Sequence, residues 1–187
     1  MEQLPKAALR ERFGQYVSRW TMKDGTQVTV RPICLEDEPL MVKFHESLSD
    51  RSVHLRYFYS FSLNARTAPD RLLRICLIDY DREMAMVAEH EDPNSETREI
   101  LGVGRLTKLQ RKNEAEVAVL VTDRYQHLGL GAELLRRLIQ VARDRKPDRL
   151  VAEILQENLP MQTLARRLGF RRVASDDPAV LKAILDL

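Results

Sequence analysis

Short apolar segments separated by polar turns dominate the second half of the chain. Residues 84–88 form a continuous apolar run, and the apolar segments 100–106 and 115–121 follow it. Polar clusters at 91–95 and 110–113 separate these segments. Runs of this length, bounded by turn-forming residues, are typical of β-strands. The three segments therefore predict an antiparallel meander.

The first half opens with a hairpin signal and continues with helical spacing. Residues 20–22 and 28–31 flank an Asp24-Gly25 pair, which favours a tight turn between two strands. Pro32 ends the second strand, because proline cannot donate a hydrogen bond to a strand ladder. Apolar residues at helical intervals then predict three helices, over residues 36–48, 51–58 and 70–76.

A longer amphipathic pattern follows the meander. Residues 132–145 place aliphatic side chains on one broad face of a helix. A strand over 150–155 comes next, and strand, helix and strand without a hairpin imply a parallel pair with a right-handed crossover. A helix over 159–168 and a hairpin of 170–173 with 179–187 complete the chain.

These elements predict an α/β fold of the α+β type. Its centre is a mixed, mostly antiparallel sheet with helices on both faces. At 187 residues the chain has the size of one domain. Residues 1–19 mix charges with isolated apolar residues, and we expect them to form a loosely attached N-terminal helical arm. Residues 20–187 then form the single domain.

Composition narrows the function classes. The net charge of +2 arises from 30 basic and 28 acidic residues, which indicates no strong nucleic-acid footprint. No apolar run approaches the ~20 residues that span a bilayer. Residues 1–19 lack the apolar core of a secretion signal. We therefore expect a cytoplasmic protein that binds neither nucleic acid nor membrane.

The cysteines and histidines indicate no metal site. Cys34 and Cys76 are far apart and match no metal or redox spacing, so we expect two buried free thiols. The four histidines show no metal-ligand spacing either.

The most informative stretch joins a strand, a turn with two glycines and a helix. The turn, residues 126–131, reads Gln-His-Leu-Gly-Leu-Gly, and the predicted helix begins at Ala132. Glycines let the backbone pass close to a ligand and present several N–H groups, while a helix N-terminus adds the positive end of its dipole. The stretch therefore predicts a cradle for an anion.

Three features together resemble the GNAT superfamily of N-acetyltransferases over nearly the whole chain. Residues 126–132 supply the signature Gln/Arg-x-x-Gly-x-Gly/Ala, and Val121 precedes that turn as the family's coenzyme-binding strand does. Asn158, followed eleven residues later by Gly169-Phe170, matches the family's late segment that ends in Leu-Gly-Phe. The resemblance implies an N-acetyltransferase that uses acetyl-CoA as co-substrate and needs no metal.

The resemblance also implies which residues hold the coenzyme. Backbone groups at Val119 and Val121 would pair with the pantetheine arm, and a main-chain N–H near Leu120 or Val121 would polarise the thioester carbonyl. Asn158 would hydrogen-bond the same arm, although capping of the following helix is a serious alternative and both roles can hold. The amides of the turn would bind the pyrophosphate; they belong to Gln126, His127, Leu128, Gly129, Leu130, Gly131 and Ala132.

Within the family, the segments 52–58, 79–85 and 115–118 are similar to the catalytic domain of bacterial protein lysine acetyltransferases. This narrower likeness implies transfer of acetyl to a lysine side chain by direct attack, without an acyl-enzyme. The partner would be a protein substrate with an exposed lysine, and an acyl-CoA synthetase is one candidate.

Glu116 is the expected catalytic residue, as general base. It lies where the lysine acetyltransferases that the chain resembles carry a catalytic glutamate. A lysine amine has a pKa of ~10.4 in water, so a base that removes its proton raises the reactive fraction. The alternative is a merely solvent-facing residue of a half-buried strand. The alternation leaves both readings open, because Glu114 shares the same face.

One position departs from the family's pattern, and two other functions stay open. Many members carry a tyrosine four residues before the glycine of the Gly-Phe pair, as an acid for the leaving thiolate; here that residue is Ala165. Arg51, Arg56 and Arg82 are expected to be solvated charges, and contact with an acidic substrate surface is the alternative. The chain alternatively acetylates a small-molecule amine in a deep acidic pocket, or is a non-catalytic acyl-CoA-binding module.

Overall fold

Eight strands form one sheet in the computed structural model, which describes residues 11–92, 95, 97–110 and 112–187. Across the sheet they lie in the order β1-β2-β3-β4-β5-β6-β8-β7. Their bounds are β1 (Ser18–Thr21), β2 (Gln27–Pro32), β3 (Glu83–Glu91), β4 (Arg98–Lys108), β5 (Glu114–Val121), β6 (Arg149–Leu155), β7 (Arg171–Val173) and β8 (Val180–Asp186).

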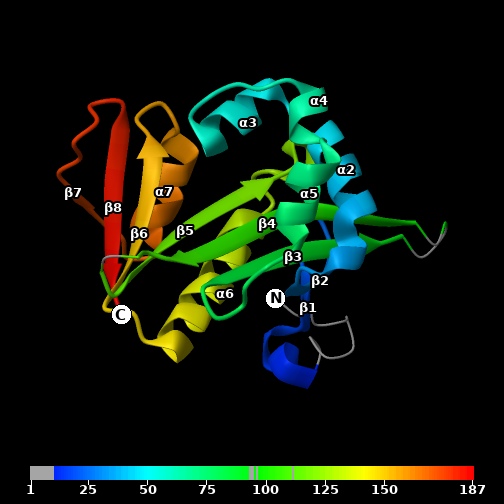
Figure 1. The fold of residues 1–187 in the computed structure, drawn as a ribbon, viewed down its shortest axis with the longest axis horizontal. Helices are drawn as coiled ribbons and strands as arrows, with labels where there is room; N and C mark the ends of the chain where they lie inside the picture. Colours follow the sequence, from blue (N-terminus) through cyan, green and yellow to red (C-terminus); the bar gives the residue numbers. More distant parts are fainter. Residues whose placement is uncertain (1–10, 93–94, 96, 111) are drawn as a thin grey trace.

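Neighbouring strands are antiparallel except β5 and β6, which run parallel. The predicted first hairpin, the meander of β3, β4 and β5, the parallel crossover and the final hairpin are therefore confirmed. So is the predicted fold class, a mixed and mostly antiparallel sheet with helices on both faces (Figure 1).

The helices form one layer on each face of the sheet. α6 and α7 contribute to the core cluster on one face, and α2, α3 and α5 contribute to the cluster on the other. The α-helices are α2 (Glu38–Glu46), α3 (Asp50–Tyr57), α4 (Leu63–Arg66), α5 (Pro69–Cys76), α6 (Leu130–Arg145) and α7 (Leu159–Arg167). Three 3-10 turns accompany them: η1 (Gly14–Tyr16), η2 (Leu35–Asp37) and η3 (Asp123–Tyr125).

Strand alternation assigns each residue of β5 to one of the two layers. Ala115, Val117 and Val121 belong to the cluster that includes the buried side chains of α6. Leu120 belongs to the cluster that includes those of α2 and α5. Since Glu116 is in step with Leu120, its side chain projects to the face of α2 to α5.

α6 packs closely on β4 because two residues of that strand are glycines. A Cβ on Gly102 would lie 2.9 Å from Cδ1 of Leu134, and a Cβ on Gly104 would lie 2.9 Å from Cδ1 of Leu138. Both leucines are fully buried. The glycines therefore let the helix approach the sheet at a separation that any side chain would increase.

β5 and β6 are partners only over their first residues. Beyond the last register pair, β5 remains bonded to β4 as far as Val121, and β6 remains bonded to β8 as far as Leu155. The two strands therefore diverge like the limbs of a V, as Figure 1 shows. The register pairs at the closed end are Glu114 with Arg149, Ala115 with Leu150 and Glu116 with Val151.

Some element bounds differ from the prediction. The helix expected over 36–48 is η2 followed by the shorter α2. α6 begins at Leu130 rather than Ala132, because Gly129 takes a φ of +95° and serves as the N-cap of the helix. α4 was not predicted, since four residues cannot show a helical period; Ser62 caps it by accepting a hydrogen bond from the N–H of Ala65.

Two predicted turns and the N-terminal arm fall partly outside the described residues. The turns at 91–95 and 110–113 include undescribed residues, and residues 1–10 of the expected arm over 1–19 are not described. Within the rest of the expected arm, Phe13 is buried and its ring centroid lies 4.8 Å from that of Tyr80. This part of the arm is therefore packed against the domain rather than loosely attached.

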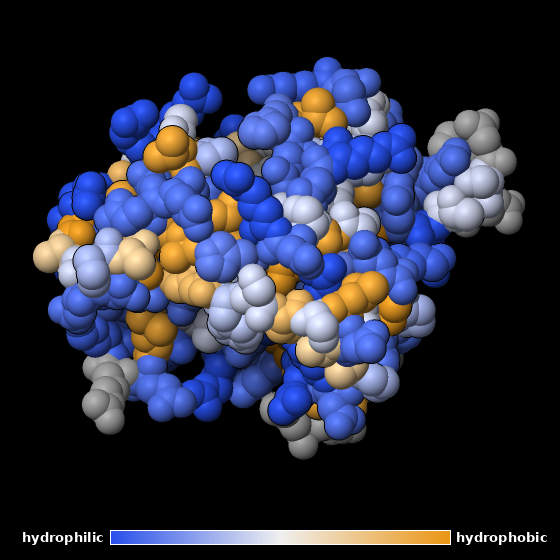
Figure 2. Space-filling view, turned by 90° about the horizontal axis from the view of Figure 1, so that it is seen from above, coloured by the Kyte–Doolittle hydropathy of each residue, from blue (hydrophilic) through white to orange (hydrophobic). Residues whose placement is uncertain are grey.

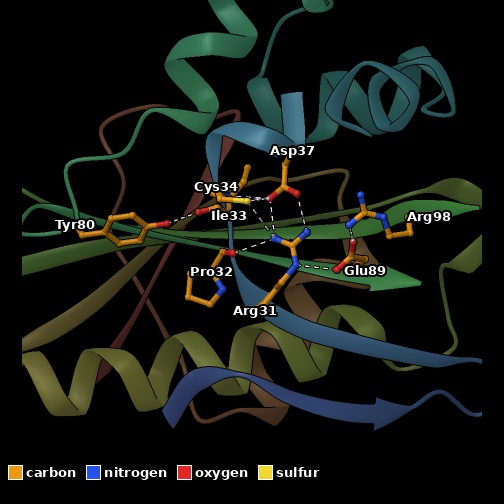
Figure 3. Close-up of polar contacts among 8 residues, drawn as sticks. All are labelled: Arg31, Pro32, Ile33, Cys34, Asp37, Tyr80, Glu89 and Arg98. Carbon is orange, nitrogen blue, oxygen red and sulfur yellow. Dashed lines mark hydrogen bonds and ion pairs between the residues drawn. The ribbon is translucent and has the colours of Figure 1, made fainter. Parts of the chain in front are cut away.

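A buried ion-pair network ties the start of the helical layer to the sheet (Figure 3). Arg31, on β2, donates to both carboxylate oxygens of Asp37, at 2.7 and 2.6 Å, and to Glu89 on β3 at 2.8 Å. Arg31 is 4% exposed and Asp37 is 2% exposed. Asp37 also accepts from the N–H of Cys34 at 2.9 Å. The network thus joins β2, β3 and η2 directly before α2.

The charge state of Asp37 depends on this pairing. Burial alone would raise the pKa of Asp37, but the hydrogen bonds and charge of Arg31 outweigh it and hold the pKa below its ordinary value. A carboxyl group whose folded pKa is depressed contributes stability above its unfolded pKa, and this stability is lost as the pH falls through the folded pKa.

Asp37→Ala should lower the free energy of unfolding by about 3–5 kcal/mol at neutral pH, because it leaves the Arg31 guanidinium buried without its main partner. Urea unfolding measures this loss. The control is Asp81→Ala, which removes an exposed pair with Arg12 and should leave the free energy unchanged within error. The gap between the variants should narrow at acid pH. Equal losses in both variants would contradict a structural role for the network.

Candidate functional site

A cleft of about 850 Å³ lies between the diverging limbs of β5 and β6. Its walls come from both strands, from α3, from the turn before α6, from the first turn of α6 and from α7. All of the site residues expected from the sequence line it except Leu128 and Leu130. The side chain of Leu130 is buried in the core cluster of α6, and that of Leu128 packs against this cluster.

The edge of β5 that faces the cleft has no partner strand from Ala118 onward. The N–H of Thr122 donates to the carbonyl oxygen of Leu101 at 2.9 Å, so the backbone hydrogen-bonding groups of Thr122 point toward β4. Because backbone groups alternate sides along a strand, Val119 and Val121 point theirs into the cleft. The backbone groups of Leu120 point toward β4. Of the two amides expected to polarise the carbonyl, only that of Val121 therefore faces the cleft. The side chain of Leu120 lines the cleft wall.

The turn before α6 offers unpaired amides. His127 and Gly129 adopt φ values of +63° and +95°. Gly129 provides no side-chain cap, and the first helical hydrogen bond runs from the N–H of Glu133 to the carbonyl oxygen of Gly129 at 3.1 Å. The N–H groups of residues 130–132 therefore have no acceptor among the described residues. This is the arrangement in which a helix N-terminus binds an anion.

A hydrogen-bonded network joins α3 to this turn. Ser49 and Ser52 donate their hydroxyl groups to the carboxylate of Asp123, at 2.6 and 2.9 Å. Gln126 donates from Nε2 to Ser52 Oγ at 3.0 Å and to the carbonyl oxygen of Val121 at 3.1 Å. Gln126 thus acts through its side chain, which holds the turn, the end of β5 and α3 in one geometry.

Asn158 caps the helix that follows it, which is one of the two roles expected from the sequence. Its Oδ1 accepts a hydrogen bond from the N–H of Met161 at 3.2 Å, at the start of α7. It also lines the cleft, so a second role toward a ligand remains compatible with this bond.

Three charged residues line the cleft on the face of α2 to α5: Glu116 on β5, Glu153 on β6 and Arg56 on α3. Burial raises the pKa of Glu116 above its ordinary value, the charge of Arg56 opposes that rise, and the charge of Glu153 adds to it. Burial also lowers the pKa of Arg56, with the charge of Glu116 among the opposing effects. The raised pKa makes Glu116 a stronger base than an exposed glutamate.

Sequence reasoning missed Ser52, Arg56 and Glu153. The expectation that Arg56 is a solvated charge is wrong, because α3 is folded over the open V and carries this guanidinium into the cleft. The sequence could have indicated Glu153 as a candidate site residue, since it is the single charged residue of the otherwise apolar segment 150–155. Ser52 had none, because its partner Asp123 is 71 residues away.

Other expectations concern residues away from the charged end. Ala165, which stands where many family members carry a tyrosine, is buried in the core. Cys34 and Cys76 are free and buried, and burial raises the pKa of each thiol to about 12. In the part of the chain that the structure describes, no group of three metal-binding side chains gathers. None of the described helices is both long and apolar enough to cross a bilayer.

Comparison with known proteins identifies relatives of the whole arrangement. A family model described as an acetyltransferase (GNAT) domain matches residues 27–171. Acetyltransferase PA5475 of Pseudomonas aeruginosa is 35% identical over 159 residues, which cover 84% of this chain and 81% of that protein.

Two solved structures share the fold. The GNAT domain of S. lividans PAT has a TM-score of 0.82 and 26% identity, over 92% of this chain and 98% of that one. The PaiA N-acetyltransferase of Thermoplasma acidophilum, solved in complex with coenzyme A, has a TM-score of 0.65 and 14% identity, over 86% of this chain and 99% of that one.

Proposed function

The chain belongs to the GNAT family of acetyl-CoA-dependent N-acetyltransferases, and we propose that it acetylates the lysine side chain of a protein, with Glu116 as general base. The observation that carries this proposal is the open V. It presents unpaired amides near one face of the sheet and a half-buried carboxylate on the other. Two substrates that enter from opposite faces would meet between β5 and β6.

The coenzyme would enter beside α6. The free amides of residues 130–132 suit its diphosphate, and Lys23 and His127 line the same cleft. The free backbone groups of Val119 and the N–H of Val121 suit the amides and carbonyls of the pantetheine arm, which would extend the sheet as a strand does. The N–H of Val121 would then donate to the thioester oxygen.

The acceptor amine would enter from the face of α3. Glu116 takes a proton from the ammonium group, so that the neutral amine attacks the thioester carbon. The C–N bond forms as the C–S bond breaks, and the departing thiolate receives the second proton of the nitrogen. Glu116 releases the first proton to solvent, which restores the carboxylate.

A protein acceptor is supported by exposed apolar side chains in the helical layer to which α3 belongs. Tyr59 and Leu63, on the segment that follows α3, are 61% and 40% exposed. Figure 2, seen from the side on which α3 and α4 lie in Figure 1, shows small hydrophobic patches within a mainly hydrophilic surface. Exposed apolar side chains with a polar rim are one feature of surfaces that contact another polypeptide. The similarity to the GNAT domain of S. lividans PAT supports the same class.

Glu116→Gln should lower kcat for a lysine peptide by ~10²-fold or more and leave acetyl-CoA affinity nearly intact. Transfer of labelled acetyl measures kcat, and calorimetry measures binding. In the wild-type protein, kcat should rise with pH as Glu116 loses its proton, at a pH above the ordinary range of glutamate because burial raises this pKa. The variant should lose that rise.

The matched control is Glu114→Gln, on the same strand and face but outside the cleft, where it lies 3.8 Å from Arg149. Its kcat should stay near that of the wild type. Equal loss in both variants, or none in Glu116→Gln, would remove Glu116 from the mechanism. Label that appears only on small amines, when a lysate is offered, would replace the protein acceptor by a metabolite.

Gly131→Glu should weaken coenzyme A binding by ~10²-fold or more, because a carboxylate at this helix start competes with the diphosphate for the same amides. A Cβ at Gly131 meets only ordinary contacts, and acidic residues suit a helix N-terminus, so the variant should fold. Gly14→Glu is the control, since nothing lies within 4 Å of a Cβ there. Normal affinity in Gly131→Glu would show that the coenzyme binds elsewhere.

A further inference from the structure

Glu153 occupies the limb of the V opposite Glu116. The last register pair joins Glu116 to Val151, and directly paired residues project to the same face. Glu153 follows Val151 by two residues on the same strand, so it also projects to that face. Leu150, Ala152 and Ile154, which alternate with Val151 and Glu153, belong to the core cluster on the opposite face, and this confirms the alternation. Glu153 therefore lies one pleat further toward the open end than Glu116.

The two carboxylates share one cleft without a close cationic partner. Among the described residues, no Lys, Arg or His nitrogen lies within the 4.0 Å of an ion pair from either one. Arg56 is the cation that α3 brings to the same space, and it stands at a longer range from Glu116. The cleft on this face thus holds two carboxylates and one guanidinium.

Solvent exposure separates the roles of the two acids. Glu116 is half-buried, whereas Glu153 is exposed at the wall of the cleft. An exposed carboxylate meets an incoming cation first. A half-buried carboxylate gains more from accepting a proton, because burial disfavours its charged form.

We propose that Glu153 is a specificity-determining residue, which binds the acceptor as an ammonium ion and delivers it to Glu116. This inference rests on the proposed function of the cleft and names its substrate class: alkyl amines that are protonated at neutral pH. Glu153 holds the ammonium by a charge-assisted hydrogen bond. Glu116 then removes one proton, and the neutral nitrogen attacks while Glu153 retains a hydrogen bond to it.

The proposal is tested with Glu153→Gln and two peptides of the same sequence. One peptide carries lysine, and the other carries a side chain of similar length that ends in an aminooxy group, a nucleophile that is uncharged at neutral pH. The variant should raise KM for the lysine peptide about tenfold or more, since a hydrogen bond to a charged group is lost. KM for the aminooxy peptide should change less than about twofold.

A second readout separates this role from a structural one. Without the negative charge of Glu153, the pKa of Glu116 should fall, so the acid limb of kcat should move to lower pH. The matched control is Glu91→Gln, an exposed residue at the end of β3 and outside the cleft, which should change neither KM nor the pH profile. Acetyl-CoA affinity should be equal in all three proteins.

The outcomes distinguish this proposal from the proposed function. If KM rises equally for both peptides, or for neither, the role of Glu153 is overturned and the acetyltransfer stands. If the wild-type protein has the lower KM for the aminooxy peptide, the same conclusion follows, because the cleft would then bind the cation no better than the neutral nucleophile. If it acetylates neither peptide, the lysine acceptor of the proposed function fails, and the role of Glu153 falls with it.

Discussion

The functional cleft depends on the loss of pairing between β5 and β6. The two strands start as parallel partners, and each then follows a different neighbour: β5 follows β4, and β6 follows β8. Backbone hydrogen-bonding groups left without a partner are costly unless water or a ligand satisfies them. The edge of β5 beyond Glu116 is therefore open to an extended ligand, and helices pack on both faces of the sheet.

The two faces of the sheet supply different chemistry to this slot. On the side of α6, the glycine turn provides amides and a helix N-terminus, which suit an anion. On the side of α3, carboxylates from both limbs and one guanidinium provide a charged end that suits an amine. The bonds of Gln126 to Ser52 and to Val121 join the two sides, because one side chain contacts α3 and the end of β5 together.

The sequence predicted the helices and strands well, but it did not predict where β5 separates from β6. Period-two alternation and the Asp24-Gly25 turn were sufficient to predict the strands, because neighbouring residues along the chain determine both signals. The turn at 126–131 was recognisable because glycine spacing and the helix that follows are also local. The opening of the V left no trace in the sequence. A strand that loses one partner keeps the same apolar pattern as long as both of its faces remain covered.

Residues placed by long-range contacts were equally hidden. The sequence around Arg56 is that of a surface charge, whereas in the structure α3 is bonded to Asp123 through Ser49 and Ser52 and Arg56 lines the cleft. Glu116 was expected as a site residue from the resemblance rather than from the pattern, because Glu114 shares its alternation. The Arg31–Asp37 pair joins residues only six apart, yet its burial depends on β3, which contributes Glu89 from 58 residues away.

A crystal structure of the protein with acetyl-CoA tests the central claim most directly. We predict that the diphosphate lies against the amides of residues 130–132, that the pantetheine arm runs along Val119 and Val121, and that the acetyl group ends beside Glu116. A coenzyme bound outside the V, or a V closed by renewed pairing of β5 with β6, would contradict the account.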